Sequence, residues 1–173
     1  MERIVIRNME EKDIEGVAEV HVSSWKTAYR GIVQDRYLDA MKKEEKIVSY
    51  KKKQMDVREK FLVAEQNGEI VGFCRYADDN RFSENMSDID CEIVALYVSP
   101  DKMYHGIGTK LFQAAVETFI CQKKHKMIIW CLRENKSSKR FYEKMGGKMQ
   151  REKKVCIGDK SYCEDGFVYD IRG

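Results

Sequence analysis

Hydrophobic residues fall into two spacings that alternate along the chain, and this alternation predicts an α/β fold. Short apolar runs predict strands, whereas apolar residues three or four positions apart predict amphipathic helices. The predicted strands are 4–7, 61–65, 70–74, 91–98, 127–132 and a final hairpin within 155–171. The predicted helices are one from Asp13, one or two within 35–59, and those at 108–123 and 137–145. The expected order is βααββ, then βαβα, then ββ.

Turn residues agree with this division. Asn67-Gly68 suits a type I′ turn and therefore predicts an antiparallel hairpin around it. Residues 91–98 are apolar on both faces, which favours a central strand of a covered sheet, and Pro100 ends that strand. Residues 77–87 are polar and predict a loop. Because no segment has a linker composition, we expect one domain over residues 1–173.

Charge and hydropathy exclude several classes of protein. Lys plus Arg is 32 against 29 for Asp plus Glu, a balance too even for a dedicated nucleic-acid binder. The lysine runs at 51–53 and 123–126 are interpreted as solvated helix faces. No apolar run reaches the roughly 18 residues that a membrane span needs, and the first residues lack a signal-peptide pattern. We therefore expect a cytoplasmic protein with neither a nucleic-acid nor a membrane partner.

The chain contains six cysteines, and their spacing argues against disulfides and metal sites. None forms a Cys-x-x-Cys pair, and four lie in strongly apolar segments. A two-residue turn at 158–159 would pair Cys163 with Lys154, which leaves Cys156 out of register for a disulfide. We expect buried reduced thiols and no metal. The six are Cys74, Cys91, Cys121, Cys131, Cys156 and Cys163.

A strand, a short loop and a glycine-bearing helix start follow one another between residues 92 and 112. Unpaired amides and the helix dipole make a helix N-terminus an anion site, and glycine allows close approach. Residues 106–110 therefore predict a pyrophosphate cradle, with a tight turn that binds nothing as the alternative. A dinucleotide fingerprint fails because Leu111 stands where a third glycine is needed, and no Walker sequence is present.

A second group of polar residues falls within the helix predicted at 137–145. Asn135, Ser138 and Tyr142 are spaced at i, i+3 and i+7, so a helix places them on one stripe. Phe141 and Met145 point about 100° away, toward the core. We expect the Tyr142 hydroxyl to point away from the core, and the alternative is that Tyr142 is another core aromatic.

On these residues the chain resembles the GNAT superfamily of N-acetyltransferases, from Glu92 to Gly147. The family's cofactor motif, Gln/Arg-x-x-Gly-x-Gly/Ala, is matched by Gly106 and Gly108, although Met103 replaces Gln or Arg. The family's later motif, Asn-x-x-Ala-x-x-Phe-Tyr-Glu-Lys-x-Gly, is matched from residue 135 to 146, with serine for alanine. Residues 25–31 are similar to an uncharacterised bacterial branch of the superfamily.

The resemblance implies a mixed seven-stranded sheet with helices on both faces and a splayed acetyl-CoA cleft between strands four and five. The strand backbone would pair with the pantetheine arm, the glycine loop would hold the pyrophosphate, and lysines including Lys110 and Lys139 would meet the 3′-phosphate. His105 or Lys110 would replace the polar contact missing at Met103. The implied cofactor residues are Leu96, Tyr97, Val98, Met103, Tyr104, His105, Gly106, Ile107, Gly108, Thr109, Lys110, Asn135, Ser138 and Lys139.

The implied reaction is direct attack of a primary amine on the thioester, without a metal. Tyr142 is the expected general acid for the thiolate and Glu92 the general base for the ammonium. Unless a bulge intervenes, Glu92 shares a strand face with Leu96 and Val98, where desolvation raises the pKa of its carboxyl group. A strand-end glutamate satisfied by a neighbour is the alternative. A covalent acetyl-cysteine route is less favoured because Cys91 points to the opposite strand face.

The acceptor is expected to be an amine on a small molecule or peptide. Trp25, Tyr29 and Asp90 are candidates for binding it, although core packing accounts for the aromatic pair and loop solvation for Asp90. A non-catalytic acyl-CoA-binding sensor or interaction module is the rival function. The oligomeric state stays open, a homodimer included.

Overall fold

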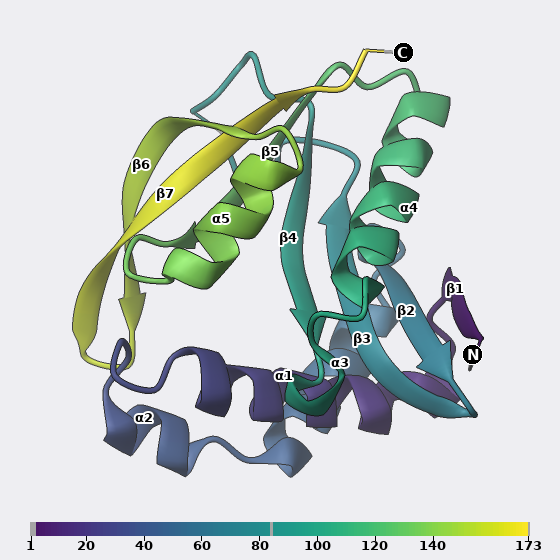
Figure 1. Cartoon of the computed structure of the whole chain (residues 1–173), viewed down its shortest axis with the longest axis vertical. Coiled ribbons are helices and arrows are strands. Elements are labelled where there is room, and N and C mark those ends of the chain that lie inside the picture. Colours follow the sequence, from purple (N-terminus) through teal and green to yellow (C-terminus); the bar gives the residue numbers. More distant parts are fainter. Residues whose placement is uncertain (1–2, 84, 173) are drawn as a thin grey trace.

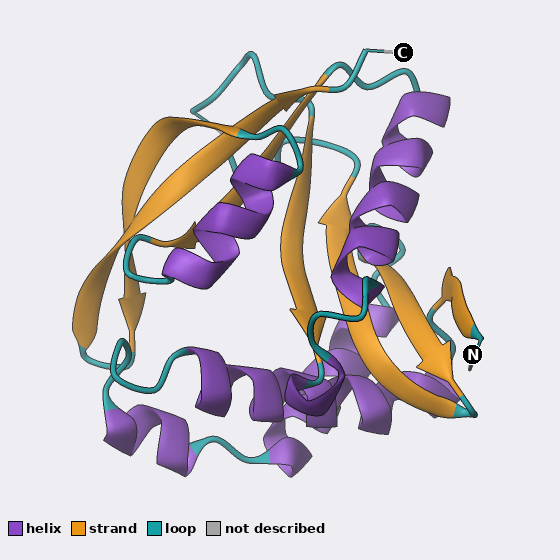
Figure 2. Cartoon of the chain, viewed as in Figure 1, coloured by secondary structure: helices purple, strands orange, loops and turns teal. Residues whose placement is uncertain are grey.

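The computed structural model describes residues 3–83 and 85–172, whose strands form one seven-stranded sheet in the order β1-β2-β3-β4-β5-β7-β6 (Figures 1 and 2). The strands are β1 (Ile4–Asn8), β2 (Lys60–Gln66), β3 (Glu69–Ala77), β4 (Cys91–Val98), β5 (Lys126–Leu132), β6 (Lys148–Ile157) and β7 (Lys160–Asp170). The α-helices are α1 (Ile14–Ala28), α2 (Asp35–Ala40), α3 (Lys43–Gln54), α4 (Ile107–Cys121) and α5 (Lys136–Lys144). Two short 3₁₀ helices are Glu11–Asp13 and Pro100–Lys102.

The predicted order of elements is confirmed, except that three α-helices rather than two separate β1 from β2, because residues 35–59 form two helices. Asn67 and Gly68 both have positive φ, at 54° and 82°, as a type I′ turn requires. The largest error is β6, which begins at Lys148, well before the predicted hairpin at 155. Residues 148–154 are mostly polar and lie on an edge strand, where charged side chains are tolerated, so apolar spacing does not reveal them.

Strand β4 pairs along most of its length with one neighbour, β3, but only over a short stretch with the other, β5. It pairs antiparallel with β3 as far as Val98, but it pairs parallel with β5 only from Cys91↔Met127 to Ile93↔Ile129. Strand β5 instead pairs with β7 along its whole length. Beyond Ile93 and Ile129 the two central strands therefore part, as can be followed in Figure 1.

A β-bulge in β4 changes which face Glu92 occupies. Arg75 pairs with Ala95 but Tyr76 pairs with Ile93, so Val94 is an extra residue on β4. Ile93 packs in the same core cluster as Leu96, and Glu92 therefore lies on the opposite face. The prediction that Glu92 shares a face with Leu96 and Val98 is wrong, because one extra residue reverses the alternation.

Helices cover both faces of the sheet. Helices α4 and α5 lie on one face, where Leu111, Phe112 and Tyr142 join the main core cluster. Helices α1 and α3 lie on the other face, where Val17 packs with Phe73 of β3. A smaller cluster joins the end of α1 and α2 to the tip of the β6–β7 hairpin. In the described part of the chain, none of the helices combines the length and apolar character that a membrane crossing requires.

All six cysteines are free. Cys74, Cys91 and Cys131 are buried as expected, but Cys121 and Cys156 are exposed, which corrects the prediction of buried thiols. The register of the last hairpin pairs Lys154 with Cys163, as the turn predicts. Within residues 3–83 and 85–172, no three side chains of His, Cys, Asp or Glu are grouped so that they could hold a metal ion.

Candidate active site

The start of α4 has the geometry of an anion cradle. Gly106 precedes the helix with φ +78°, and the helix begins at Ile107, one residue before the predicted start. The amide of Lys110 is the first to reach back, donating to the Gly106 carbonyl at 3.1 Å. The amides before it lack intrahelical acceptors, and no side chain caps them. This end of α4 is therefore suited to a phosphate oxygen.

Gly108 connects this cradle to two other predicted parts of the site. A Cβ atom at Gly108 would lie 3.7 Å from Val98 on β4 and 3.7 Å from Phe141 on α5. The glycine loop, the end of β4 and α5 thus meet at one place, although 33 residues separate Gly108 from Phe141 in the sequence.

The loop before α4 contributes few polar side chains. Tyr104 is 91% exposed, and Met103 is half-buried without a polar atom to offer. The Nδ1 atom of exposed His105 lies 2.8 Å from the Met103 carbonyl oxygen, so this ring is turned back onto its own loop. Lys110 is exposed on the first turn of α4 and can reach an anion held there.

The end of β4 offers backbone groups toward the opened side of the sheet. Leu96, Tyr97 and Val98 are half-buried, and β5 is no longer paired with them. One of the backbone acceptors has a partner within the protein, because the Ser24 hydroxyl of α1 donates to the Val98 carbonyl at 3.0 Å.

Two residues of α5 that were predicted to contact the cofactor have structural partners instead. Asn135 is buried and caps the helix, its Oδ1 accepting from the Ser138 amide at 3.2 Å. Lys139 donates to the Asp165 carboxylate at 2.7 Å. The Lys139 ammonium group is therefore paired with a carboxylate of β7, and this geometry does not support the predicted contact between Lys139 and a phosphate. No motif links β7 to α5, so the sequence does not reveal this pair.

Tyr142 is only 7% exposed and packs in the main core cluster beside Phe141 and Phe167. The prediction that its stripe of α5 points away from the core is therefore wrong: both Asn135 and Tyr142 are buried. Burial raises the pKa of the Tyr142 hydroxyl well above its ordinary value, so the group carries its proton at neutral pH.

Three tyrosines from different elements influence one another where the sheet opens. Burial raises the pKa of Tyr29, the residue that follows α1, and the nearby hydroxyls of Tyr97 on β4 and Tyr142 on α5 raise it further. Tyr142 belongs to the cluster on one face of the sheet and Tyr97 packs with the cluster on the other. Their proximity is consistent with the parting of β4 from β5 beyond Ile93.

Glu92 is the buried carboxylate of this region. Its side chain is 3% exposed, and its Oε2 atom accepts a hydrogen bond from the Ser83 hydroxyl at 3.2 Å. Burial raises the pKa of Glu92 to about 7, against the opposing effects of Lys153 and the Ser83 hydrogen bond. A carboxylate in this range can both accept and release a proton near neutral pH.

Three more charged residues act on Glu92, and sequence reasoning missed all three. Lys153 of β6 and Glu164 of β7 form an ion pair at 3.6 Å, and the Lys153 ammonium lies 4.3 Å from the centre of the Trp130 ring. Glu164 raises the pKa of Glu92, whereas Lys153 and Arg75 lower it. These residues belong to no motif. Lys153 also lies outside the predicted hairpin, which begins at residue 155.

The three residues predicted to bind the amine acceptor lie in different surroundings. Asp90 accepts hydrogen bonds from the amides of His125 and Lys126, both at 2.9 Å, so both of its carboxylate oxygens help to join the starts of β4 and β5. Trp25 is half-buried, stacked 5.5 Å from the His21 ring and edge-on to Tyr29 at 4.7 Å. Of these candidates, Tyr29 is the one whose pKa both Tyr97 and Tyr142 raise.

Comparison with known proteins identifies this arrangement. A model of the acetyltransferase (GNAT) family matches residues 19–147, which include α4, β4 and α5. The chain belongs to this family. Such an acetyltransferase takes its acetyl group from acetyl-CoA, which a cradle for phosphate oxygens suits. An uncharacterised N-acetyltransferase of Archaeoglobus fulgidus is 33% identical over 139 residues, 79% of this chain and 88% of that protein.

Solved acetyltransferase structures share the fold of this one. A PaiA N-acetyltransferase of Thermoplasma acidophilum in complex with coenzyme A has a TM-score of 0.71 at 23% identity, covering 94% of this chain and 98% of that one. YncA of Salmonella typhimurium, a putative acetyltransferase with its cofactor acetyl-CoA, has a TM-score of 0.71 at 18% identity, covering 99% and 95%.

Proposed function

We propose that residues 1–173 form a single cytoplasmic acetyltransferase domain that acetylates a primary amine of a small molecule or peptide in a ternary complex. Glu92 acts as the general base and Tyr142 as the general acid. The observation that supports this most strongly is the Glu92 carboxylate, which is buried beside the opening between β4 and β5 with its pKa raised to about 7.

The chain's own residues move two protons in this proposal. Acetyl-CoA supplies an activated thioester when it is bound. Glu92 takes a proton from the ammonium group of the acceptor, so that the nitrogen lone pair becomes available for attack on the thioester carbon. Tyr142, which burial keeps protonated, would give its proton to the departing sulfur, and the second proton that the nitrogen loses on forming the amide would restore Tyr142. Neither step needs a metal ion.

The start of α4 and the end of β4 would hold the cofactor in a defined direction. The amides of Ile107, Gly108 and Thr109 receive the pyrophosphate, and the backbone from Leu96 to Val98 receives the pantetheine arm. Lys110 is the exposed cation on this end of α4 and takes a phosphate oxygen. Asn135 and Lys139 are left out because they have internal partners.

The buried cysteines do not favour a covalent route. Burial raises the pKa of the Cys131 thiol to about 12, and it raises the pKa of Cys91 further above the ordinary value. Since the thiolate is the nucleophile, both groups are poorly reactive near neutral pH. We therefore propose direct transfer rather than an acetyl-enzyme.

The acceptor approaches from the face that α1 covers. Glu92 lies on that face, opposite to Leu96, and Tyr97 packs there with the cluster beneath α1. Trp25 of α1 and Tyr29, which follows α1, are aromatic residues that would line this approach. An amine held between α1 and β4 would have its nitrogen near Glu92 and its acetyl donor between the parted strands.

The test combines turnover with cofactor binding. A panel of primary amines is screened for thiol release, and the best acceptor is then used with Glu92→Gln and Tyr142→Phe. Removing a general acid or base costs about 10²-fold or more in turnover, so each variant should lose well over tenfold. Glu152→Gln removes an exposed carboxylate of β6 that pairs with Arg133, so this variant is the control and should keep full activity.

Binding must survive in the two active-site variants. Saturating acetyl-CoA, but not NAD, should raise the unfolding midpoint of all variants by roughly 5 °C or more. A wild-type protein that binds acetyl-CoA but acetylates no amine would be a non-catalytic acyl-CoA-binding module. Losses below tenfold in both variants would show that Glu92 and Tyr142 do not have the assigned roles.

A further inference from the structure

The segment of residues 78–83, between β3 and β4, brings a buried hydroxyl to Glu92. Ser83 is 5% exposed, and its hydroxyl donates to Glu92 Oε2 at 3.2 Å. The backbone turns tightly just before it, since the Ser83 amide donates to the Asn80 carbonyl at 2.8 Å. Neither the cofactor motif nor the α5 motif includes this segment.

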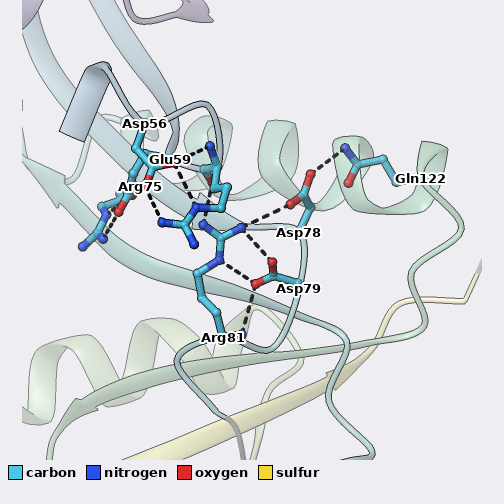
Figure 3. Close-up of polar contacts among 8 residues, drawn as sticks. Asp56, Glu59, Arg75, Asp78, Asp79, Arg81 and Gln122 are labelled. Carbon is cyan, nitrogen blue, oxygen red and sulfur yellow. Dashed lines mark hydrogen bonds and ion pairs between the residues drawn. The ribbon is translucent and has the colours of Figure 1, made fainter. Parts of the chain in front are cut away.

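Arg81 fixes this segment from one side. Its guanidinium donates to both Asp79 carboxylate oxygens at 2.7 Å and to the Arg58 carbonyl at 3.1 Å. Figure 3 shows Asp78 and Asp79 gathered around Arg81, near the turn that carries Asp56 and Glu59. The Arg58 carbonyl belongs to the connection between α3 and β2, so Arg81 ties the segment to a different part of the chain.

Phe82 gives the segment a second contact. Its ring lies 5.1 Å from the Arg75 guanidinium of β3, and Arg75 in turn donates to both Glu59 oxygens at 2.7 and 2.6 Å. Ser83 thus directly follows two residues that are each held by a charged partner. Its hydroxyl is positioned by these contacts and not by flexible loop geometry alone.

We propose that Ser83 is a positioning residue for Glu92 and that Arg81 holds Ser83 in place. The hydroxyl fixes one carboxylate oxygen, and Oε1, which has no hydrogen-bond partner among the described residues, receives the acceptor's proton. This inference rests on the proposed role of Glu92 as base. The hydrogen bond favours the charged carboxylate and offsets part of the effect of burial.

Replacing Ser83 should therefore make Glu92 easier to protonate. The other charged groups that face Glu92, Arg75, Lys153 and Glu164, stay in place in such a variant. In Ser83→Ala, and in the nearly isosteric Ser83→Cys, the pKa of Glu92 should rise by about half a pH unit to one pH unit, which corresponds to one lost hydrogen bond. Ser87→Ala, an exposed serine further along the same loop, should leave it unchanged.

The experiment follows the Cδ resonance of Glu92 by ¹³C NMR between pH 5 and 9 in labelled protein, with Glu92→Gln identifying the signal. Arg81→Met should raise the pKa of Glu92 in the wild type but add nothing in the Ser83→Ala background. An unchanged pKa in Ser83→Ala and Ser83→Cys would overturn the proposal. Additive effects of Arg81→Met and Ser83→Ala would overturn the role of Arg81.

Turnover separates this inference from the function on which it rests. With the best amine from the thiol-release screen, the acid limb of kcat/KM should move upward by the same amount as the NMR titration. The amine's own titration is common to all variants and cancels. If the NMR pKa rises but the acid limb does not move, Ser83 still acts on Glu92, and the assignment of Glu92 as base fails.

Discussion

Glu92 on β4 and Asp165 on β7 are two carboxylates with almost the same burial and opposite proton affinities. Their side chains are 3% and 1% exposed. Glu92 faces the α1 side with one serine as its hydrogen-bond donor, and burial raises its pKa to about 7. Asp165 accepts from Arg133 at 2.9 Å and from Lys139 at 2.7 Å, and these donors lower its pKa in spite of burial.

The difference shows that two carboxylates with the same low solvent exposure can behave in opposite ways, because cationic donors keep Asp165 charged and Glu92 lacks such donors among the described residues. Asp165 is a permanent anion that connects β7 to α5 and to the end of β5, so it contributes to stability. Glu92 has no cation within salt-bridge distance in the described structure, so its charge is costly and its proton is easily exchanged near neutral pH. One carboxylate holds the half of the sheet that carries β7 together, and the other is available for proton transfer.

The largest expected effect is on Asp165. Asp165→Asn removes the anion from between two cations and should lower the free energy of unfolding at pH 7 by about 3 kcal/mol, the low end for broken buried pairs because Arg133 and Lys139 are partly hydrated. Urea unfolding measures this loss. Glu152→Gln removes the exposed partner of Arg133 and should cost less than about 0.5 kcal/mol. Equal, small losses in both variants would mean that Asp165 is no different from a surface pair.

The next effect is the pH dependence of stability, which should have opposite signs for the two carboxylates. Because the pKa of Glu92 is raised in the folded protein, folding binds a proton between about pH 4.5 and 7, and stability falls as pH rises through that window. Glu92→Gln should therefore exceed the wild type by about 2 kcal/mol at pH 8, and the gap should close toward pH 5.

Asp165 supplies the matching measurement. Its lowered pKa gives stability that is present above about pH 4 and is lost as the pH falls further. In urea unfolding from pH 3 to 8, the difference between wild type and Asp165→Asn should shrink at the acid end. A constant gap between wild type and Glu92→Gln from pH 5 to 8 would show that Glu92 is not protonated in the folded protein.

The sequence predicts the local parts of this fold well. Apolar spacing locates β4 and α4, because burial of one face or both is a local property of the residues. The type I′ turn at Asn67-Gly68 is likewise local. The start of β6 is missed because an edge strand needs few apolar residues. The burial of Tyr142 is missed because the polar stripe of α5 that carries it packs against the sheet, and local periodicity does not show this.

The sequence predicts which residues form the candidate site better than it predicts the face, burial and partners of their side chains. Tyr142 and the amides around Gly108 come from motifs and Glu92 comes from its place on the predicted strand, but one extra residue at Val94 reverses the predicted face of Glu92. Ser83 and Asp165 reach their partners only through tertiary packing. Residue pairs that are far apart in the sequence and lack periodic spacing leave no trace that a single sequence can reveal.

The smallest expected effect is on the affinity for acetyl-CoA, and it distinguishes Lys110 from Lys139, both of which the sequence places near the 3′-phosphate. Lys139→Met should cost about 1 kcal/mol of stability, because Asp165 keeps Arg133 as a second partner, and it should leave the Kd for acetyl-CoA within twofold of the wild type. Lys110→Met should leave stability unchanged and raise that Kd about three- to fivefold, an effect that weakens at high salt. Isothermal titration calorimetry with urea unfolding of the same samples measures both quantities. A larger loss of affinity in Lys139→Met than in Lys110→Met would show that Lys139 leaves Asp165 when acetyl-CoA binds, and the carboxylate on β7 would then belong to the binding site as well.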